Sequence, residues 1–212
     1  MKTLNLKMDN IIINIGRQFA SGGRYISKKL CEEFGCQYFD KEILDIAAKE
    51  SGFTPAVFKK NDEKKNFIHT LFHLHAPMLS DDNFYNNKFS EESLFQFQCD
   101  AIKKAASQGS CLFIGRCADY VLRNEPNTVS IFLTADLKDR ISRTMERSQV
   151  DEETAVKMIS KKESTRSSYY NYYTGKKWGA AESYDLCVNT SILGLDETAK
   201  FLAEFIRKKC GR

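Results

Sequence analysis

Short apolar runs alternate with amphipathic stretches along most of this chain. Five of these runs are compact enough for buried strands, and they cover residues 11–15, 36–40, 111–115, 129–134 and 184–190. Elsewhere apolar residues recur every three or four positions, which predicts helices over 24–34, 41–50, 90–108, 136–147, from 151 to 164 or beyond, and 195–209. Strands that alternate with helices predict an α/β fold, here a three-layer sandwich around a mainly parallel five-stranded sheet.

Residues 53–89 interrupt this alternation. They contain two of the three prolines and all three histidines of the chain, His69, His73 and His75. This composition predicts a less regular insert with short helices. His69 and His73 have the spacing of one helix face, but no acidic or thiol partner stands at a distance typical of metal sites, so we expect no metal site here.

A glycine-rich turn joins the first apolar run to the first helix. In a nucleotide-binding loop, two glycines separated by four residues precede a lysine that reaches the phosphates and a hydroxyl that binds Mg²⁺. Here Gly22 matches the second glycine, Arg17 takes the place of the first with Gly16 just before it, Gly23 stands at the lysine position and Arg24 at the hydroxyl position. In this interpretation Arg17 or Arg24 supplies the missing charge. The alternative is an ordinary strand-to-helix turn whose glycines serve geometry alone.

Arginines recur on one face of the predicted helix 136–147. Arg140, Arg143 and Arg147 are three and four residues apart, beside an apolar stripe of Leu137, Ile141 and Met145. Like charges on one face repel unless an anion lies opposite, so the face is a candidate phosphate clamp. The alternative is a solvated face that Asp136, Asp139 and Glu146 partly neutralise.

Tyrosines and lysines are dense in residues 169–178, which read Tyr-Tyr-Asn-Tyr-Tyr-Thr-Gly-Lys-Lys-Trp. Aromatic rings stack on nucleobases, and lysine binds phosphate. The segment is therefore a candidate binding surface. The alternative is the end of a helix that packs its tyrosines on the core.

Composition narrows the classes of function. The net charge of +4 is mild and spread along the chain, so it suits a small anion and gives no argument for nucleic acid. No apolar run approaches a membrane span, and charged residues interrupt the N-terminal stretch, so we expect a cytoplasmic protein. Seven cysteines without a CxxC pair predict reduced thiols, and the apolar neighbours of Cys111 and Cys187 predict core positions.

Several segments together resemble the cytidylate kinase-like family, a branch of the P-loop nucleoside monophosphate kinases. They are residues 15–24, 38–44, 114–122, 131–136, 169–178 and 184–191. The resemblance implies one P-loop NTPase-like domain over 1–212, with a core of 10–52, 90–147 and 181–210, a helical monophosphate-binding insert over 53–89 and a lid over 148–180. It implies phosphoryl transfer from ATP, with Mg²⁺, to a small phosphate-bearing acceptor such as CMP. The departures at Gly23 and Cys117 leave a non-catalytic nucleotide- or phosphate-binding module as the alternative.

The resemblance also assigns roles to individual residues. The donor phosphates would bind to Gly16, Arg17, Ser21, Gly22, Gly23, Arg24 and Tyr25. The acceptor would bind to Asp40, Arg116, Asp119, Tyr170, Tyr173 and Lys176. Transfer itself would depend on Arg24, Arg116, Arg140, Arg143 and Arg166. Arg116 is the arginine of an Asp-Gly-Arg-Asp motif whose two aspartates are replaced here, and Asp119 is the nearest carboxylate.

Overall fold

The computed structural model describes residues 10–40, 43 and 91–211. All five predicted strands are present: β1 Ile12–Arg17, β2 Gln37–Phe39, β3 Cys111–Ile114, β4 Thr128–Thr134 and β5 Leu186–Asn189. They form one sheet in the order β2-β3-β1-β4-β5, and every neighbouring pair is parallel. The prediction of a five-stranded parallel sheet is confirmed.

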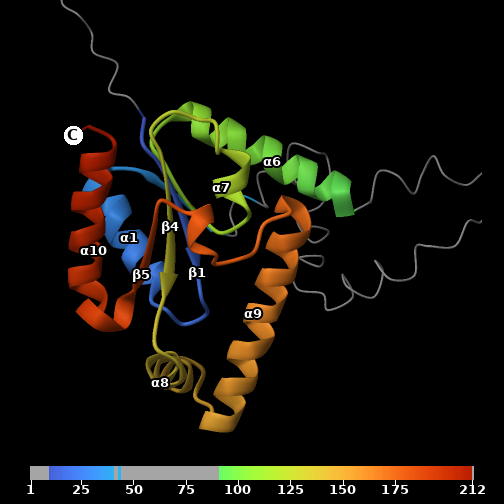
Figure 1. The fold of residues 1–212 in the computed structure, drawn as a ribbon, viewed down its shortest axis with the longest axis vertical. Coiled ribbons are helices and arrows are strands. Elements are labelled where there is room, and N and C mark those ends of the chain that lie inside the picture. Colours follow the sequence, from blue (N-terminus) through green and yellow to red (C-terminus); the bar gives the residue numbers. More distant parts are fainter. Residues whose placement is uncertain (1–9, 41–42, 44–90, 212) are drawn as a thin grey trace, which may run out of the picture.

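The described helices, labelled as in Figure 1, are α1 Gly23–Phe34, α6 Glu91–Gln108, α7 Ala118–Val121, α8 Leu137–Ser148, α9 Glu152–Thr174 and α10 Thr190–Lys209. A short 3-10 turn, Ala181–Ser183, follows α9. The short helix α7 was not predicted, and α9 runs ten residues past the predicted position 164. The insert over 53–89, with its three histidines, lies outside the described residues.

Helices cover both faces of the sheet, which explains the uninterrupted apolar run of β1. Ile13 and Ile15 pack in one core cluster with α1 and α10, whereas Ile12 packs on the other face with Ile102 of α6. Figure 1 shows the same layers, with α1 and α10 on one side and α6 and α7 on the other. A parallel strand covered on both sides has no solvent-facing positions, so its sequence does not alternate.

The edge strand β5 behaves differently from the predicted buried strand. Leu186 and Val188 pack on the α10 side, whereas Cys187 points the other way and is exposed. The core position predicted for Cys187 is therefore wrong, while Cys111 in the central strand β3 is buried as predicted. All seven cysteines of the chain are free thiols in the structure.

The carboxyl ends of parallel strands meet at one edge of the sheet, where ligands bind in open α/β proteins. At that edge β1 passes into the glycine-rich turn, and β4 leads into α8, with α9 continuing from there (Figure 1). Asp151 caps α9 by accepting a hydrogen bond from the Thr154 backbone N–H. Within the described part of the chain, no helix has both the length and the apolar character needed to cross a bilayer.

Candidate functional site

The turn between β1 and α1 is built so that backbone can approach an anion. Gly22, at φ 82°, precedes α1, and no side chain caps the first N–H groups of this helix. A Cβ at Gly22 would lie 2.3 Å from the end of the Leu195 side chain of α10, and the positive φ itself favours glycine there. The Thr190 hydroxyl donates to the Ser21 carbonyl, and the Ser21 hydroxyl donates to the Gln18 carbonyl. A firmly held turn with uncapped helix N–H groups is typical of a phosphate site.

A cavity of about 830 Å³ opens at this turn. Its walls come from the β1–α1 turn, the end of β2, the turn after β3, α8 and α9. The described residues that line it include eight basic side chains, from Arg17, Arg24, Arg116, Arg143, Arg147, Lys161, Lys162 and Arg166, and two acidic ones, from Asp40 and Asp119. Such crowding of cations in one cleft attracts and stabilises anions that carry several charges.

Two arginines of the loop region meet the carboxylate at the end of β2. Arg24 donates from Nε to Asp40 Oδ2 over 2.8 Å, and its Nη2 lies 2.8 Å from the same oxygen. Arg17 Nη2 is 3.5 Å from Asp40 Oδ1. Burial and the charge of Arg166 lower the pKa of Arg17 to about 9 from its usual 12.5, so Arg17 stays charged at neutral pH. The structure thus places Asp40 among the cations predicted to serve the donor.

The turn after β3 holds Arg116 in a rare backbone conformation. Gly115, Arg116 and Cys117 follow one another with φ values of 66°, 64° and 56°. Residues with a side chain rarely adopt this left-handed conformation, because it costs energy. Such strained residues cluster at functional sites. Gln98 of α6 donates to the Arg116 carbonyl, and the Tyr169 hydroxyl of α9 donates to Gln98. These bonds hold the turn so that Arg116 lines the cavity.

A half-buried carboxylate, that of Asp119, lies in the same wall. The Tyr170 hydroxyl donates to Asp119 Oδ2 over 2.7 Å, and the Tyr184 ring stacks near Tyr170 with centroids 6.4 Å apart. Burial raises the pKa of Asp119 above its usual value, and the hydrogen bond from Tyr170 and the charge of Lys176 oppose that rise. Asp119 and Tyr170, two of the residues predicted to bind the acceptor, line the cavity, and Tyr184 is an additional wall residue that the sequence did not single out.

The lid-side cations gather around Phe19 of the turn. The guanidinium carbons of Arg147 and Arg166 lie 4.9 Å and 5.5 Å from the centre of its ring. Arg143 Nη1 donates to the Ala20 carbonyl, and Arg166 Nη1 donates to the Arg17 carbonyl. Helices α8 and α9 therefore contact the loop directly and bring the predicted Arg143 and Arg166 to the cavity.

Arg140 does not share this placement. It is buried, donates from Nε to the Ala135 carbonyl, and pairs through Nη1 with Glu163 Oε1 of α9 at 2.5 Å. Glu163 also accepts from the Phe19 backbone N–H. Arg140 is not among the residues lining the cavity, so the structure gives no support to its expected part in transfer. We assign it to holding α8, α9 and the loop together.

The buried face of α8 also differs from the predicted stripe. Arg140 and Thr144 are its buried residues, whereas Leu137 is half exposed. The apolar stripe that begins at Leu137 is therefore not the buried face of α8, which packs through the Arg140–Glu163 pair and the buried Thr144 hydroxyl, which donates to the Arg140 carbonyl.

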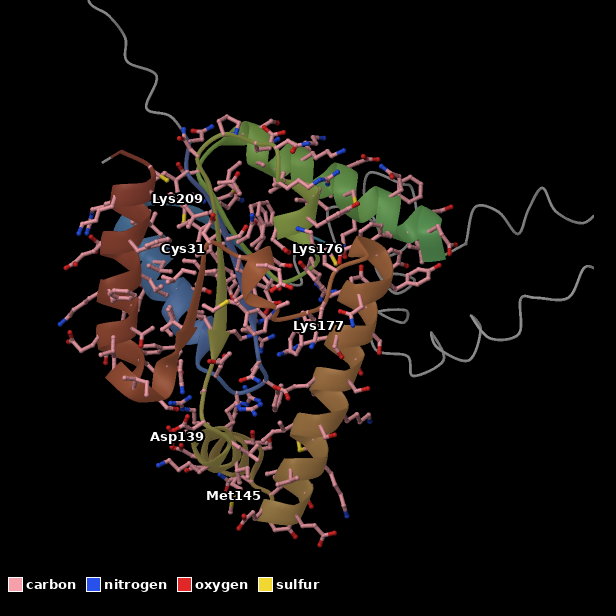
Figure 2. All side chains as sticks on the ribbon, in the orientation of Figure 1. Cys31, Asp139, Met145, Lys176, Lys177 and Lys209 are labelled. Carbon is pink, nitrogen blue, oxygen red and sulfur yellow. The ribbon has the colours of Figure 1, made fainter. Side chains whose placement is uncertain are left out.

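At the tyrosine-rich end of α9, some tyrosines face the cavity, as a binding surface would, and others pack between helices. Tyr169 and Tyr170 line the cavity. Tyr173 stacks on Phe95 of α6 with centroids 3.8 Å apart, and the Tyr172 hydroxyl donates to Glu92. Tyr173 thus packs between helices and does not reach the cavity. Figure 2 shows that Lys176 and Lys177 follow the end of α9; neither lines the cavity.

Two further predicted loop residues have packing partners. A Cβ at Gly16 would lie 2.7 Å from the Phe132 ring. The Tyr25 hydroxyl donates to Asp196 of α10 over 2.6 Å, although Tyr25 also borders the cavity.

The sequence did not single out two lysines that line the cavity, Lys161 and Lys162. Lys162 could have been found from its spacing to Arg166, because residues four apart lie on one face of a helix such as α9.

Comparison with known proteins agrees with this geometry. A profile of the cytidylate kinase-like family matches residues 12–192. The chain belongs to the cytidylate kinase-like family.

Individual relatives are more distant than the family match. A cytidylate kinase of Pyrococcus horikoshii is 26% identical over 185 residues, which cover 86% of this chain and 81% of that protein. The crystal structure of an uncharacterized protein from Eubacterium ventriosum is 29% identical, with a TM-score of 0.70 over 93% of this chain and 98% of that one. A shikimate kinase from Bacteroides thetaiotaomicron is 9% identical with a TM-score of 0.52 over the same two shares, and it shares the P-loop NTPase-like fold. Family and fold together support nucleotide kinase activity in general.

Kinases of such families use their nucleotide with Mg²⁺, an ion that proteins bind through oxygen ligands. The loop position that would offer a hydroxyl is Arg24, and the Ser21 hydroxyl is buried on the Gln18 carbonyl. Both Asp40 oxygens are paired with arginines, and Asp119 accepts from Tyr170. Among the described residues, no group of three or more His, Cys, Asp or Glu side chains could hold a metal ion. This donor set does not fit a Mg²⁺ ion held by the loop.

Proposed function

We propose that this family member transfers a phosphoryl group from a nucleoside triphosphate such as ATP to a small phosphate-bearing acceptor, in the first instance a nucleoside monophosphate such as CMP. The observation that carries the proposal is one cavity in which the uncapped start of α1 meets eight basic side chains. The name of the Pyrococcus relative, cytidylate kinase, supports the choice of CMP as the first acceptor to test.

The donor end of the cavity would be the β1–α1 turn. Gly22 and Gly23 let the backbone approach the phosphates, and the first N–H groups of α1 bind them. Arg143 and Arg147 of α8 border the same turn and would neutralise the remaining charge. Arginine suits this task because its fork of N–H donors meets two phosphate oxygens at once.

The acceptor end would lie between β2 and the turn after β3. Arg116 and Asp40 would position the acceptor phosphate, and Asp40 also pairs with Arg24 and Arg17 of the donor side. Asp119, Tyr170 and Tyr184 form a polar and aromatic wall suited to a base or sugar. The insert over 53–89, which lies outside the described residues, would be the monophosphate-binding part of the single domain.

In the transfer step, an oxygen of the acceptor phosphate attacks the γ-phosphorus of the donor. The bond from that phosphorus to the bridging oxygen breaks, and the nucleoside diphosphate leaves. Phosphoryl transfer needs mainly positioning and charge neutralisation. Arg166 of α9 contacts the loop through the Arg17 carbonyl and would bring a further charge as the lid segment 148–180 closes.

A turnover assay tests the proposal. ATP with Mg²⁺ is offered together with CMP, UMP, AMP or GMP, and diphosphate formation is measured. We expect turnover with at least one acceptor. Nucleotide binding without transfer to any of them would refute the kinase and leave a nucleotide-binding module, the alternative that Gly23 and Cys117 favour.

One matched pair of variants tests the acceptor site. Arg116→Met should raise the KM for the acceptor about tenfold or more, because a charge-assisted bond to phosphate is lost. Arg123→Met removes the same charge from an exposed residue just after α7 that does not line the cavity. Its KM should equal that of the wild type, and equal effects of the two substitutions would contradict the role of Arg116.

A further inference from the structure

One arginine occupies the space beside the position of the missing lysine. A Cβ built at Gly23 would lie 3.0 Å from Cγ and 3.1 Å from Cβ of Arg17, so the stem of Arg17 runs along that position. Its guanidinium reaches the turn after β3, where a Cβ at Gly115 would lie 2.6 Å from Nη1. Gly23 and Gly115 together leave the room that the Arg17 side chain fills.

The charge on Arg17 is incompletely balanced in this place. Its side chain is 13% exposed, and its one close carboxylate among the described ion pairs is Asp40, at 3.5 Å. Arg24, Arg116 and Arg166 all act on it as like charges. A buried cation surrounded by cations is stabilised when an anion enters, as a donor phosphate would.

A second arginine stands where the loop usually offers a hydroxyl to Mg²⁺. Arg24 is the second residue of α1, and its guanidinium lies on Asp40 at the end of β2. It therefore stands between the donor turn and the carboxylate on the acceptor side. A cation at this point would neutralise the phosphates of a bound donor, a charge that a loop-bound metal ion would otherwise balance.

We infer that Arg17 replaces the loop lysine and that Arg24 replaces the loop-bound metal ion, so that the cavity binds a nucleoside triphosphate without needing a divalent cation. The inference rests on the proposed function, because it concerns how the donor is held. The two arginines have different tasks: Arg17 would bind the donor phosphates beside Gly23, and Arg24 would neutralise charge between donor and acceptor. Arg24 and Mg²⁺ would compete for the same phosphate oxygens, so added Mg²⁺ should leave donor affinity unchanged or lower it.

Calorimetric titration with the non-hydrolysable analogue AMP-PNP, in EDTA or in excess Mg²⁺, tests the metal. Wild-type protein should bind at least as tightly in EDTA. Arg24→Ser restores the loop hydroxyl; its affinity in EDTA should fall about ten- to a hundredfold, and Mg²⁺ should recover part of the loss. The control Lys28→Ser removes an exposed charge one turn further along the same face of α1 and should bind like the wild type in both conditions.

The outcomes separate the two proposals. Binding by the wild type only in the presence of Mg²⁺ would overturn the inference and leave the proposed kinase intact. Binding in neither condition would overturn the proposed function itself. An equal loss of affinity in Arg24→Ser and Lys28→Ser would show a general charge effect and would also overturn the role given to Arg24.

A reciprocal exchange tests Arg17. Arg17→Gly should lose about tenfold or more in AMP-PNP affinity, and Gly23→Lys should also lose affinity because its stem collides with Arg17. The double variant Arg17→Gly/Gly23→Lys rebuilds the usual loop and should recover most of the loss. A double variant that folds, as thermal unfolding shows, yet binds no better than the weaker single variant would overturn the exchange, and so would a Gly23→Lys protein with full affinity.

Discussion

Two arginines on one helix, Arg140 and Arg143, should have opposite phenotypes. Arg140→Met removes a buried guanidinium whose Nη1 lies 2.5 Å from Glu163 Oε1 and whose Nε donates to the Ala135 carbonyl. Breaking one side of a buried ion pair costs 3–5 kcal/mol, and because the Glu163 side chain is 22% exposed, water offsets part of this, so we expect a loss of about 2–4 kcal/mol. Nucleotide affinity of the folded protein should change little.

Arg143→Met should do the reverse. Its Nη1 donates to the Ala20 carbonyl and its side chain borders the cavity, so the free energy of unfolding should fall by about 1 kcal/mol or less. Loss of a charge-assisted bond to phosphate should weaken nucleotide binding about ten- to a hundredfold. Urea denaturation measures the first quantity and calorimetric titration the second, on the same preparations.

A double-mutant cycle checks the reason for the Arg140 effect. Glu163→Gln keeps an oxygen for the Phe19 N–H but removes the charge that Arg140 needs. In Arg140→Met/Glu163→Gln no charge remains unpaired, so the double variant should regain at least half of the stability lost by Arg140→Met. Strictly additive losses would refute the pairing as the cause. If Arg140→Met has wild-type stability but does not bind nucleotide, Arg140 acts on the nucleotide, as the sequence predicted, and not in packing.

Three further predictions concern stability and redox state. Burial raises the pKa of Asp119, so the folded protein binds a proton more tightly than the unfolded chain, and its stability falls as pH rises from the usual pKa near 3.8 through the raised pKa. Asp119→Asn should therefore melt at a higher temperature than the wild type at neutral pH. A higher melting temperature that persists below pH 3.8 would contradict this cause. The buried amide of Asn14 in β1 has no hydrogen-bond partner among the described residues, so Asn14→Leu should stabilise the protein by about 1–3 kcal/mol in urea denaturation, and a loss would show that its partner lies elsewhere. The sulfur atoms of Cys31 and Cys36 are 3.2 Å apart, so diamide, which takes up the two thiol hydrogens, should join them, and mass spectrometry of digests should find this pair before any other.

The fold was predictable because a parallel sheet leaves a simple imprint on the sequence. Strands such as β1 are buried on both faces and therefore read as unbroken apolar runs. The place of the site followed from the same fact, since the carboxyl ends of parallel strands meet at one edge. Asp40 directly follows β2, Arg116 is the second residue after β3, and the turn around Gly22 joins β1 to α1; the structure brings all three to one cavity.

What the sequence did not reveal depends on tertiary pairing. Arg140 and Arg143 have the same spacing pattern and the same residue type, and only the direction of α9 decides that Arg140 meets Glu163, 23 residues further along. Likewise, Cys187 lies in an apolar strand like Cys111, but its strand is at the sheet edge, where the second face is uncovered. Periodicity identifies a face of a helix or strand and does not say what covers it.

The missing lysine can now be explained by volume as well as by charge. A lysine at position 23 and an arginine at position 17 would claim the same space, because the Arg17 stem lies within 3.1 Å of where a Cβ at Gly23 would be. A side chain at 23 would crowd the Arg17 stem, so a glycine at 23 suits an arginine at 17, and the space beside that position is filled by another cation. Eight basic side chains held around one cavity repel one another, and this arrangement costs stability unless an anion repays it. The departures from the usual loop thus argue for a phosphate ligand held differently, and not for its loss.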